Sequence, residues 1–292
     1  MTSPAQYYLG IDGGGTRCRA RLCSAEGQVL GEGEAGPGNI RLGLSSVWGN
    51  ITEAATAAAM TAGLNKDIFP STRLGAGLAG VVSDADIDRV ITAAPAFKSV
   101  HVSSDAYIAC LGAFNGGDGG ILIIGTGSAG LALKGGEVHH IGGWGFEAGD
   151  GGSAAALGHE AVKEALAAKD GFRDSSPLVG NILQALGGEP ERIIDWINKA
   201  TPSDYGALAP MVVEACDGGD ALGQELVAQT VAEIDIHLRK LLSFGIAKIT
   251  LCGGMAGVMA PRLSEALQAV LVPPLDQPVG GAVLLARRAS EV

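Results

Sequence analysis

Along the first part of the chain, short apolar runs alternate with tight, glycine-containing turns, a pattern that predicts strands. Residues 7–11 are apolar or aromatic except for Gly10, as expected for a buried strand. Residues 17–23 alternate polar and apolar positions, which is typical of a half-buried strand, and a third short run follows at 28–30. Because tight turns join these three segments, we predict an antiparallel meander over residues 7–35.

Helical spacing appears directly after the meander. Residues 45–62 are rich in alanine and place apolar side chains three or four positions apart, which predicts a helix. A Ser-x-x-Asp capping box at Ser83 predicts a second helix that ends near Ala94. The remaining elements of this half are predicted to be strands at 74–78 and 100–103 and a helix at 106–114. Three strands, helix, strand and helix is the order of a ribonuclease-H-like half.

The same pattern of strand, glycine-rich turn, strand, turn and strand occurs a second time, which predicts an internal repeat. Residues 121–124 form another apolar run, and further strands are predicted at 129–133 and 138–141. The elements predicted after them are helices at 153–168, 177–186 and 189–199, a long helix capped by Asp220 and stopped by Gly245, a strand at 246–252 and helices at 261–270 and 280–288.

The repeat predicts two domains, and 292 residues are enough for two separate cores. A glycine-rich joint at 115–120 separates the halves. We expect an N-terminal lobe over residues 1–115 that is completed by the C-terminal helix 280–292. The C-terminal lobe is expected over residues 116–279, with a helical insertion after its first three strands.

Composition narrows the class of protein. Hydrophobic residues make up 47% and charged residues 17%, as in a globular protein, and no apolar run approaches the ~18 residues that a membrane span needs. A net charge of -11 argues against a nucleic-acid partner. The five cysteines are scattered, and the N-terminal residues lack the features of a signal peptide. We therefore expect reduced thiols in a cytoplasmic protein without a membrane partner.

The residues behind the first strand carry the most informative chemistry, Asp12-Gly13-Gly14-Gly15-Thr16. Glycines let backbone N–H groups close around an anion, whereas the Asp12 carboxylate repels phosphate unless a cation lies between them. No Gly-Lys-Ser/Thr follows, so the run is not a P-loop. Alone, the run fits an ordinary hairpin turn equally well. The second copy at 125–128 favours a pair of phosphate clips that grip one nucleotide.

Gly-x-Gly-x-x-Gly is a weak signal in this chain. With 46 glycines in 292 residues, roughly one match is expected by chance, and matches begin at Gly31, Gly75 and Gly125. The match at Gly75 precedes a predicted helix, and Asp105 follows the next strand, as in a dinucleotide-binding unit. The meander that comes first argues against this alternative.

Eight motifs in order, spread over nearly the full length, resemble the BadF/BadG/BcrA/BcrD-type ATPase family of the sugar kinase/Hsp70/actin superfold. Within that family the likeness is to bacterial glucosamine and N-acetylglucosamine kinases. The resemblance implies an α/β fold of two ribonuclease-H-like (actin-like ATPase) domains with a central cleft. The motifs are residues 10–16, 38–40, 77–80, 105–107, 125–128, 142–145, 149–153 and 251–254.

The resemblance also implies a role for each matching residue. Asp12 is similar to the carboxylate that holds Mg²⁺, usually through water, and Asp105 to the catalytic base. The implied ATP contacts are Gly13, Gly14, Gly15, Thr16, Gly125, Thr126, Gly127 and Ser128 for the phosphates and Gly253 and Gly254 for the adenosine. The implied substrate contacts are Asn39, Ala79, Gly80, Asp105, Trp144 and Asp150. One departure is Gly151, where relatives often carry Glu or Gln.

Ordinary structural roles compete with several of these assignments. Asp105 and Asp150 each precede a predicted helix and could be N-caps. Asn39 lies in a turn-forming Gly-Pro-Gly-Asn stretch, while the glycines around Trp144 favour an exposed ring.

The resemblance implies ATP-dependent phosphoryl transfer to the 6-hydroxyl of glucosamine or N-acetylglucosamine, and it allows a homodimer. The alternatives are an activator ATPase of a dehydratase or reductase system and a non-enzymatic sugar-responsive regulator.

Overall fold

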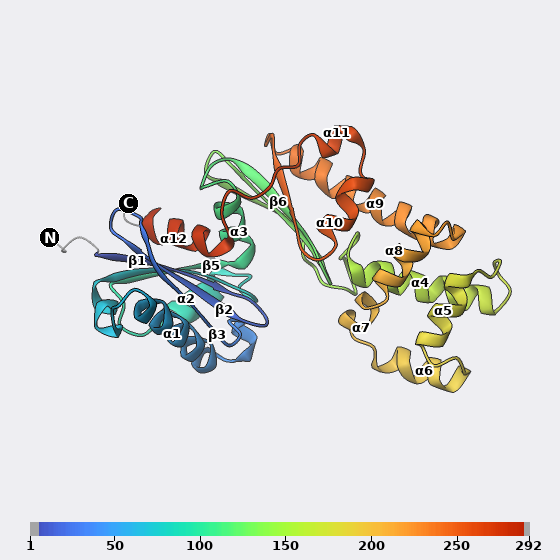
Figure 1. Cartoon of the computed structure of the whole chain (residues 1–292), viewed down its shortest axis with the longest axis horizontal. Helices are drawn as coiled ribbons and strands as arrows, with labels where there is room; N and C mark the ends of the chain where they lie inside the picture. Colours follow the sequence, from blue (N-terminus) through green and yellow to red (C-terminus); the bar gives the residue numbers. More distant parts are fainter. Residues whose placement is uncertain (1–5, 289–292) are drawn as a thin grey trace. The chain divides into compact units, whose positions relative to one another are not determined.

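The structure is a computed structural model that describes residues 6–288. The chain divides into two compact units (Figure 1). Unit 1 comprises Met1–Gly119 together with Pro273–Val292, and unit 2 comprises Gly120–Val272. Each unit has its own hydrophobic core.

Unit 1 is built on a five-stranded sheet in the order β3-β2-β1-β4-β5. The strands are β1 (Tyr7–Gly13), β2 (Cys18–Ser24), β3 (Val29–Ala35), β4 (Thr72–Leu78) and β5 (Ser99–Ser104). β1 to β3 form the predicted antiparallel meander, whereas β4 runs parallel to β1 and β5 runs parallel to β4. The carboxyl ends of β1, β4 and β5 therefore lie at one edge of the sheet.

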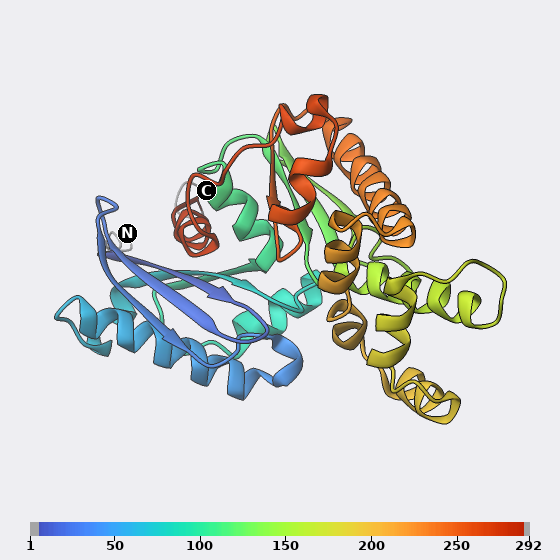
Figure 2. The same ribbon diagram turned by 45° about the vertical axis from the view of Figure 1, so that its right-hand side comes forward.

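Helices cover both faces of this sheet (Figures 1 and 2). α1 (Leu44–Thr61) and α2 (Asp84–Thr92) lie on one face, where the Trp48 indole donates to the Val90 carbonyl over 3.0 Å. α3 (Asp105–Ala113) and α12 (Pro278–Arg288) lie together on the other face. Two short 3₁₀ turns, Ile40–Leu42 and Lys66–Ser71, complete the unit. The final helix thus belongs to unit 1.

Glycines inside the strands let the helices approach the sheet closely. A Cβ on Gly33 would lie 2.4 Å from the Ala54 carbonyl oxygen of α1, and one on Gly75 would lie 2.2 Å from the Ala282 carbonyl oxygen of α12. Gly75 lies within β4 and not in a turn that opens a helix. The dinucleotide-binding alternative is therefore wrong, because the match at Gly75 is a helix-packing feature.

Unit 2 repeats the start of this topology. Its sheet has the order β8-β7-β6-β9, in which β9 runs parallel to β6, and Leu271 adds a parallel bridge to Ile249. The strands are β6 (Gly119–Ile124), β7 (Ser128–Lys134), β8 (Glu137–Gly142) and β9 (Ile249–Cys252). Three consecutive strands followed by a parallel fourth strand occur in both units. The predicted duplication of a ribonuclease-H-like fold is confirmed.

The helices of unit 2 pack around α4 and α9, whose inward faces join strand residues such as Leu122 and Ile124 in one core. They are α4 (Ala154–Lys169), α5 (Pro177–Ala185), α6 (Pro190–Lys199), α7 (Pro202–Gly206), α8 (Ala209–Asp217), α9 (Ala221–Leu242), α10 (Ala256–Met259) and α11 (Glu265–Gln268). Asp220 caps α9 as predicted, through a 3.1 Å bond from the Gly223 N–H.

Two expectations for unit 2 differ from the structure. The single helix predicted at 261–270 is wrong, because a 3₁₀ turn at Ala260–Arg262 and the short α11 are separated by Leu263 and Ser264 in extended conformation. Helices α7, α8 and α10 were not among the predicted elements. None of the helices described between residues 6 and 288 combines the length and apolar character of a membrane span.

Candidate functional site

The carboxyl ends of three parallel strands bring most of the predicted residues of unit 1 together. β1 ends in Asp12-Gly13, β4 leads into Ala79-Gly80, and β5 leads into Asp105 at the start of α3. Asp12 is paired in register with Gly77 of β4. Ligand sites of open α/β sheets lie at such carboxyl ends.

Asp12 lies in an unfavourable place for a negative charge. Burial is the main cause that raises the pKa of its carboxyl group, and the nearby negative charge of Asp105 raises the pKa further. Arg19 and Arg17 oppose this by lowering it. The neighbouring Cys18 thiol has its pKa raised to about 12 by burial and by the charge of Asp12. A cation beside Asp12 would offset the repulsion between the two carboxylates.

The first glycine-rich turn is held by the segments that carry the other predicted residues of unit 1. Ala79 N–H donates to the Gly13 carbonyl over 2.8 Å, and Gly38 N–H donates to the Gly14 carbonyl over 2.9 Å. The Thr16 side chain is exposed at the tip. Asp12, the turn, Asn39, Ala79 and Gly80 are thus brought into one neighbourhood.

Asn39 and Gly80 meet within this neighbourhood. The Asn39 side chain caps the 3₁₀ turn by accepting from Arg41 N–H over 3.0 Å, so its predicted turn role is confirmed. Its amide oxygen lies 2.8 Å from where a Cβ on Gly80 would be, and Gly80 has a φ of +85°. Any larger residue at position 80 would displace the Asn39 amide.

The cap of α3 distinguishes two roles that the sequence could not separate. Ser104, not Asp105, is the N-cap, because its hydroxyl accepts from Tyr107 N–H over 3.1 Å. Asp105 is the first helical residue, and its Oδ1 accepts from Ala106 N–H over 2.8 Å. The N-cap alternative for Asp105 is therefore wrong. Its carboxylate stays at the helix N-terminus, where the helix dipole favours negative charge.

The second glycine-rich turn, residues 125–127, connects β6 and β7 of unit 2 as the first connects β1 and β2. Two N–H groups from the first turn of α4 hold it: Ala154 donates to the Gly125 carbonyl over 2.8 Å, and Ala155 to the Thr126 carbonyl over 3.2 Å. Ser128 is buried, and its hydroxyl donates to the Gly151 carbonyl over 2.9 Å. A phosphate contact by the Ser128 hydroxyl would have to replace this bond.

Asp150 holds the same turn from the other side. Its Oδ1 accepts from Ser128 N–H over 3.2 Å, and its backbone has a φ of 63°, which is uncommon for a residue other than glycine. The N-cap of α4 is Ser153, whose hydroxyl accepts from Ala156 N–H. The N-cap alternative for Asp150 is therefore wrong. Strained backbone of this kind persists only where surrounding contacts enforce it, and it is concentrated at functional sites.

Gly253 joins this group at the carboxyl end of β9. It has a φ of +92°, and a Cβ would lie 2.4 Å from the Ile124 carbonyl oxygen that precedes the turn at 125–127. Gly254 faces open space and is exposed. The structure thus gives a packing reason for glycine at position 253 and leaves the surface of position 254 accessible.

A pocket of about 820 Å³ lies beside Asp150 within unit 2. The loop 142–152 forms one wall, and Trp144 on this loop is 80% exposed, as predicted from its glycine neighbours. α4 and α9 form the other walls. Its polar and charged lining residues are Glu147, Asp150, Glu160, Gln229, Thr230, Glu233 and His237.

The contribution of α9 to this pocket was missed from sequence. Gln229, Glu233 and His237 follow one another at four-residue intervals and so share one side of the helix. The polar residues do recur at a helical interval in the sequence, but the apolar face of α9 has the stronger periodic pattern. A polar row beside a buried face on a long helix is a pattern that could have pointed to the pocket.

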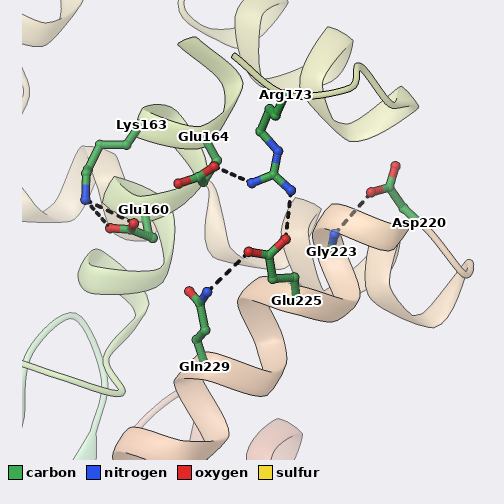
Figure 3. Close-up of polar contacts among 8 residues, drawn as sticks. All are labelled: Glu160, Lys163, Glu164, Arg173, Asp220, Gly223, Glu225 and Gln229. Carbon is green, nitrogen blue, oxygen red and sulfur yellow. Dashed lines mark hydrogen bonds and ion pairs between the residues drawn. The ribbon is translucent and has the colours of Figure 1, made fainter. Parts of the chain in front are cut away.

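Ionic contacts connect the two helical walls (Figure 3). Arg173 binds Glu164 of α4 and Glu225 of α9, the latter over 2.7 Å. Gln229 in turn donates to Glu225 over 3.4 Å. These contacts set the spacing between α4 and α9 close to the pocket.

The residues present are compatible with Mg²⁺ at Asp12. Between residues 6 and 288 there is no group of three or more His, Cys, Asp or Glu residues arranged to hold a metal by themselves. Mg²⁺ in phosphoryl-transfer sites usually needs only one or two carboxylates, because water and phosphate oxygens complete its shell. Asp12 with Asp105 nearby meets that lower requirement.

Comparison with known proteins identifies the relationship. The model of the BadF/BadG/BcrA/BcrD ATPase family matches residues 9–286. The glucosamine kinase GspK of Vibrio cholerae is 38% identical over 280 residues, which cover 96% of this chain and 95% of that protein. An N-acetylmuramic acid/N-acetylglucosamine kinase of Clostridium acetobutylicum is 27% identical over 81% of this chain and 79% of its own length.

A solved structure gives the same answer for the fold. A Chromobacterium violaceum protein proposed to be an N-acetylglucosamine kinase superposes with a TM-score of 0.85 at 32% identity, covering 97% of this chain and 99% of its own. The family model spans both units, from within β1 to within α12. The duplicated topology, the two glycine-rich turns and these matches together establish that the chain belongs to the BadF/BadG/BcrA/BcrD ATPase family.

Proposed function

We propose that this protein is an amino-sugar kinase that transfers the γ-phosphoryl group of ATP to the 6-hydroxyl of glucosamine or N-acetylglucosamine. The observation that carries the proposal is full-length similarity to a glucosamine kinase, at 38% identity over 96% of the chain. Membership of an ATPase family supports ATP as the phosphoryl donor.

ATP is proposed to be bound by residues of both units. The proposed phosphate contacts are Gly13, Gly14, Gly15 and Thr16 of unit 1 and Gly125, Thr126 and Gly127 of unit 2, where Thr16 and Thr126 carry exposed hydroxyls. The N–H groups of Gly14 and Gly125 shape the two turns, because they donate to the Arg17 and Gly127 carbonyls over 2.9 Å each. Ser128 is also a proposed phosphate contact, and its hydroxyl supports the second turn by donating to the Gly151 carbonyl. Gly253 and Gly254 are proposed to face the adenosine, where the open surface of Gly254 leaves room for a ligand.

Asp12 is proposed to hold Mg²⁺ through water. The metal would neutralise charge on the transferring phosphoryl group, which is the chemistry it supplies when bound. The pKa of the Asp12 carboxyl is raised because Arg19 and Arg17 do not fully offset its burial and the charge of Asp105, so a bound cation would favour the ionised form. The negative charge of Asp12, which lies near Asp105, would then be balanced by the metal ion.

Asp105 is proposed to be the catalytic base. A sugar hydroxyl is a poor nucleophile, so a carboxylate must accept its proton as the phosphoryl group is transferred. Asp105 lies at the sheet edge that also carries Asp12, and capping of α3 by Ser104 leaves its second carboxylate oxygen without a capping role. Asn39, Ala79 and Gly80 of unit 1, and Trp144 and Asp150 of unit 2, are proposed to hold the sugar.

The alternative functions have less support. An activator ATPase of a dehydratase belongs to the same family, but both curated relatives described above are named as sugar kinases. No observation favours a sugar-responsive regulator. The preference between the free amine and the N-acetyl group is a separate question.

The decisive experiment is a coupled assay of ADP formation with ATP and Mg²⁺ as donor. Glucosamine, N-acetylglucosamine and glucose are compared as acceptors, and the product is identified by mass spectrometry and NMR as a 6-phosphate. We expect kcat/KM for at least one amino sugar to exceed that for glucose at least about tenfold, because a specific polar contact to the amino substituent is worth about 1–3 kcal/mol. ATP hydrolysis without phosphorylation of any sugar would refute the proposal.

A further inference from the structure

The absence of a side chain at position 151 creates a feature that the proposed catalytic roles do not use. A Cβ on Gly151 would lie 2.8 Å from Oε2 of Glu233. The next residue, Gly152, packs against Ile234 in the same way, at 2.7 Å. Two consecutive glycines therefore let α9 approach the loop after Asp150, and the Glu233 carboxylate occupies the space that a side chain at 151 would fill.

Glu233 lies in the pocket that also contains Asp150 and Trp144. Among the residues that the structure describes, no hydrogen bond or ion pair engages its carboxylate, whereas Glu160 of the same pocket is paired with Lys163. Lining cations are lacking too: the described residues around this pocket include no lysine or arginine, and His237 is its one residue able to carry positive charge. The Glu233 side chain is exposed and no described residue pairs its carboxylate, so the carboxylate is open to a ligand in the pocket.

A second polar side chain of α9, His237, lines the same pocket. The Nδ1 atom of His237, one turn further along α9, is buried without a hydrogen-bond partner. Glu233 and His237 share one side of α9 and both line the pocket. Because Nδ1 is closed to solvent, a ligand in the pocket would meet only the outer part of the imidazole ring.

We infer that Glu233 is a specificity-determining residue of the sugar site, where its carboxylate accepts hydrogen bonds from the protonated amino group of glucosamine. This inference rests on the proposed function. An ammonium group paired with a carboxylate forms a charge-assisted hydrogen bond, which is stronger than a neutral one. The neutral and larger N-acetyl group offers no positive charge, so Glu233 favours the free amine over the amide.

The first test replaces Glu233→Gln, which keeps the shape of the side chain and removes its charge. We expect kcat/KM for glucosamine to fall about 10- to 100-fold, the effect of losing one hydrogen bond between charged groups. The kcat/KM for glucose, which lacks the amine, should change less than about twofold, and the value for N-acetylglucosamine should stay the same or rise.

A matched control, Asp235, lies two residues further along the same helix. Asp235→Asn removes one negative charge from α9, but Asp235 pairs with Arg239 and does not line the pocket. This variant should keep the wild-type ratio of glucosamine to glucose activity. It separates a local contact from a general change in the charge of unit 2.

Gly151→Ala tests the same contact without altering any charge. Its Cβ must push the Glu233 carboxylate aside, since 2.8 Å is shorter than real Cβ contacts. Glucosamine activity should fall selectively, as in Glu233→Gln, while circular dichroism and the melting temperature report whether the fold is kept.

The outcomes separate this inference from the proposed function. If Glu233→Gln lowers activity on glucosamine and glucose by the same factor, or leaves both unchanged, Glu233 is not a specificity determinant although the kinase assignment stands. If the wild-type protein phosphorylates none of the sugars, the proposed function itself fails. Selective loss of glucosamine activity in both Glu233→Gln and Gly151→Ala supports the inference.

Discussion

At the scale of single residues, Asp12 and Asp105 are two carboxylates at the carboxyl ends of β1 and β5, on either side of β4, with different expected roles. Asp12 is buried enough for its pKa to be raised, whereas Asp105 is anchored at a helix N-terminus through Ala106 N–H. Removing each charge should therefore have different consequences for activity and for stability.

Replacing Asp105→Asn should abolish turnover without abolishing sugar binding. The amide cannot accept the hydroxyl proton, and loss of a general base typically costs 10²- to 10⁴-fold, so we expect kcat to fall by about that factor. The coupled assay measures turnover, and isothermal titration calorimetry measures sugar binding. A variant with near-normal kcat would remove Asp105 from the role of base.

Replacing Asp12→Asn should make the protein more stable while it loses Mg²⁺-dependent activity. Because burial raises the pKa of Asp12 in the folded state, folding of the ionised form is penalised at neutral pH. We expect a gain on the order of 1 kcal/mol, or roughly 2–4 °C in melting temperature. Differential scanning fluorimetry at pH 7 without ligand measures it.

The sign of this effect depends on pH. A raised pKa means that the penalty grows as pH rises through the range between the ordinary value of 3.8 and the folded value, and disappears below it. The difference between Asp12→Asn and wild type should therefore shrink as the pH is lowered towards 3.8. A difference that grows at low pH would show that burial of this charge is not the cause.

The sequence located the glycine-rich turns of the candidate site, but it did not reveal which hydrogen bonds its aspartates make. The glycines of both turns were found because they break apolar runs at strand ends. The competition between cap and functional roles for Asp105 and Asp150 could not be resolved, since a serine one or three residues away was an equally good N-cap. Glu233 was missed because its partner feature is a missing side chain, Gly151, far away in sequence.

At the scale of elements, the predictions were most accurate where local signals agreed. The meander, α1 and α9 each combine clear periodicity with glycine turns or a capping residue. The helix predicted at 261–270 is wrong because Leu263 and Leu267 have helical spacing but lie in different elements. Leu263 ends the 3₁₀ turn and Leu267 lies in α11, and both side chains are buried. α7 was missed even though Thr201 and Asp204 form a capping box, because the helix is only five residues long.

Two glycines on helices of unit 2 should respond oppositely to alanine. A Cβ on Gly158 of α4 would lie 1.8 Å from the Tyr205 carbonyl oxygen of α7, so Gly158→Ala must separate these helices. Overpacking of this kind costs about 1–3 kcal/mol. Gly180 of α5 is exposed, with nothing within 4 Å of its Cβ position, so Gly180→Ala should gain about 0.5–1 kcal/mol from helix propensity.

Denaturant unfolding followed by circular dichroism measures both free energies, with each glycine variant serving as the control for the other. The ordering Gly180→Ala above wild type above Gly158→Ala is the expected result. Equal stability of Gly158→Ala and wild type would mean that α4 and α7 are not in contact.

At the scale of the whole molecule, the chain leaves unit 1 after Gly119 and returns to it at Pro273. Ion pairs fix the returning segment, since Arg21 of β2 binds Asp276 over 2.8 Å and Glu32 over 2.7 Å. α12 then contributes Val279, Ala282 and Ala286 as buried residues. The sequence suggested that the last helix packs back on the first half, but which strands it covers depends on the glycines of β1 and β4, which no local pattern reveals.

Because each unit has its own core, a packing defect should be felt mainly in the unit that contains it. Gly281→Ala tests this in unit 1, since its Cβ would lie 1.9 Å from the Ile108 carbonyl oxygen where α12 meets α3. Hydrogen–deuterium exchange followed by mass spectrometry should show faster exchange in α3, α12 and β4 of this variant, with the amides of α4 and α9 unchanged. Gly158→Ala should give the reverse pattern. Faster exchange throughout both units in either variant would mean that the two cores unfold as one cooperative structure, despite their separate packing.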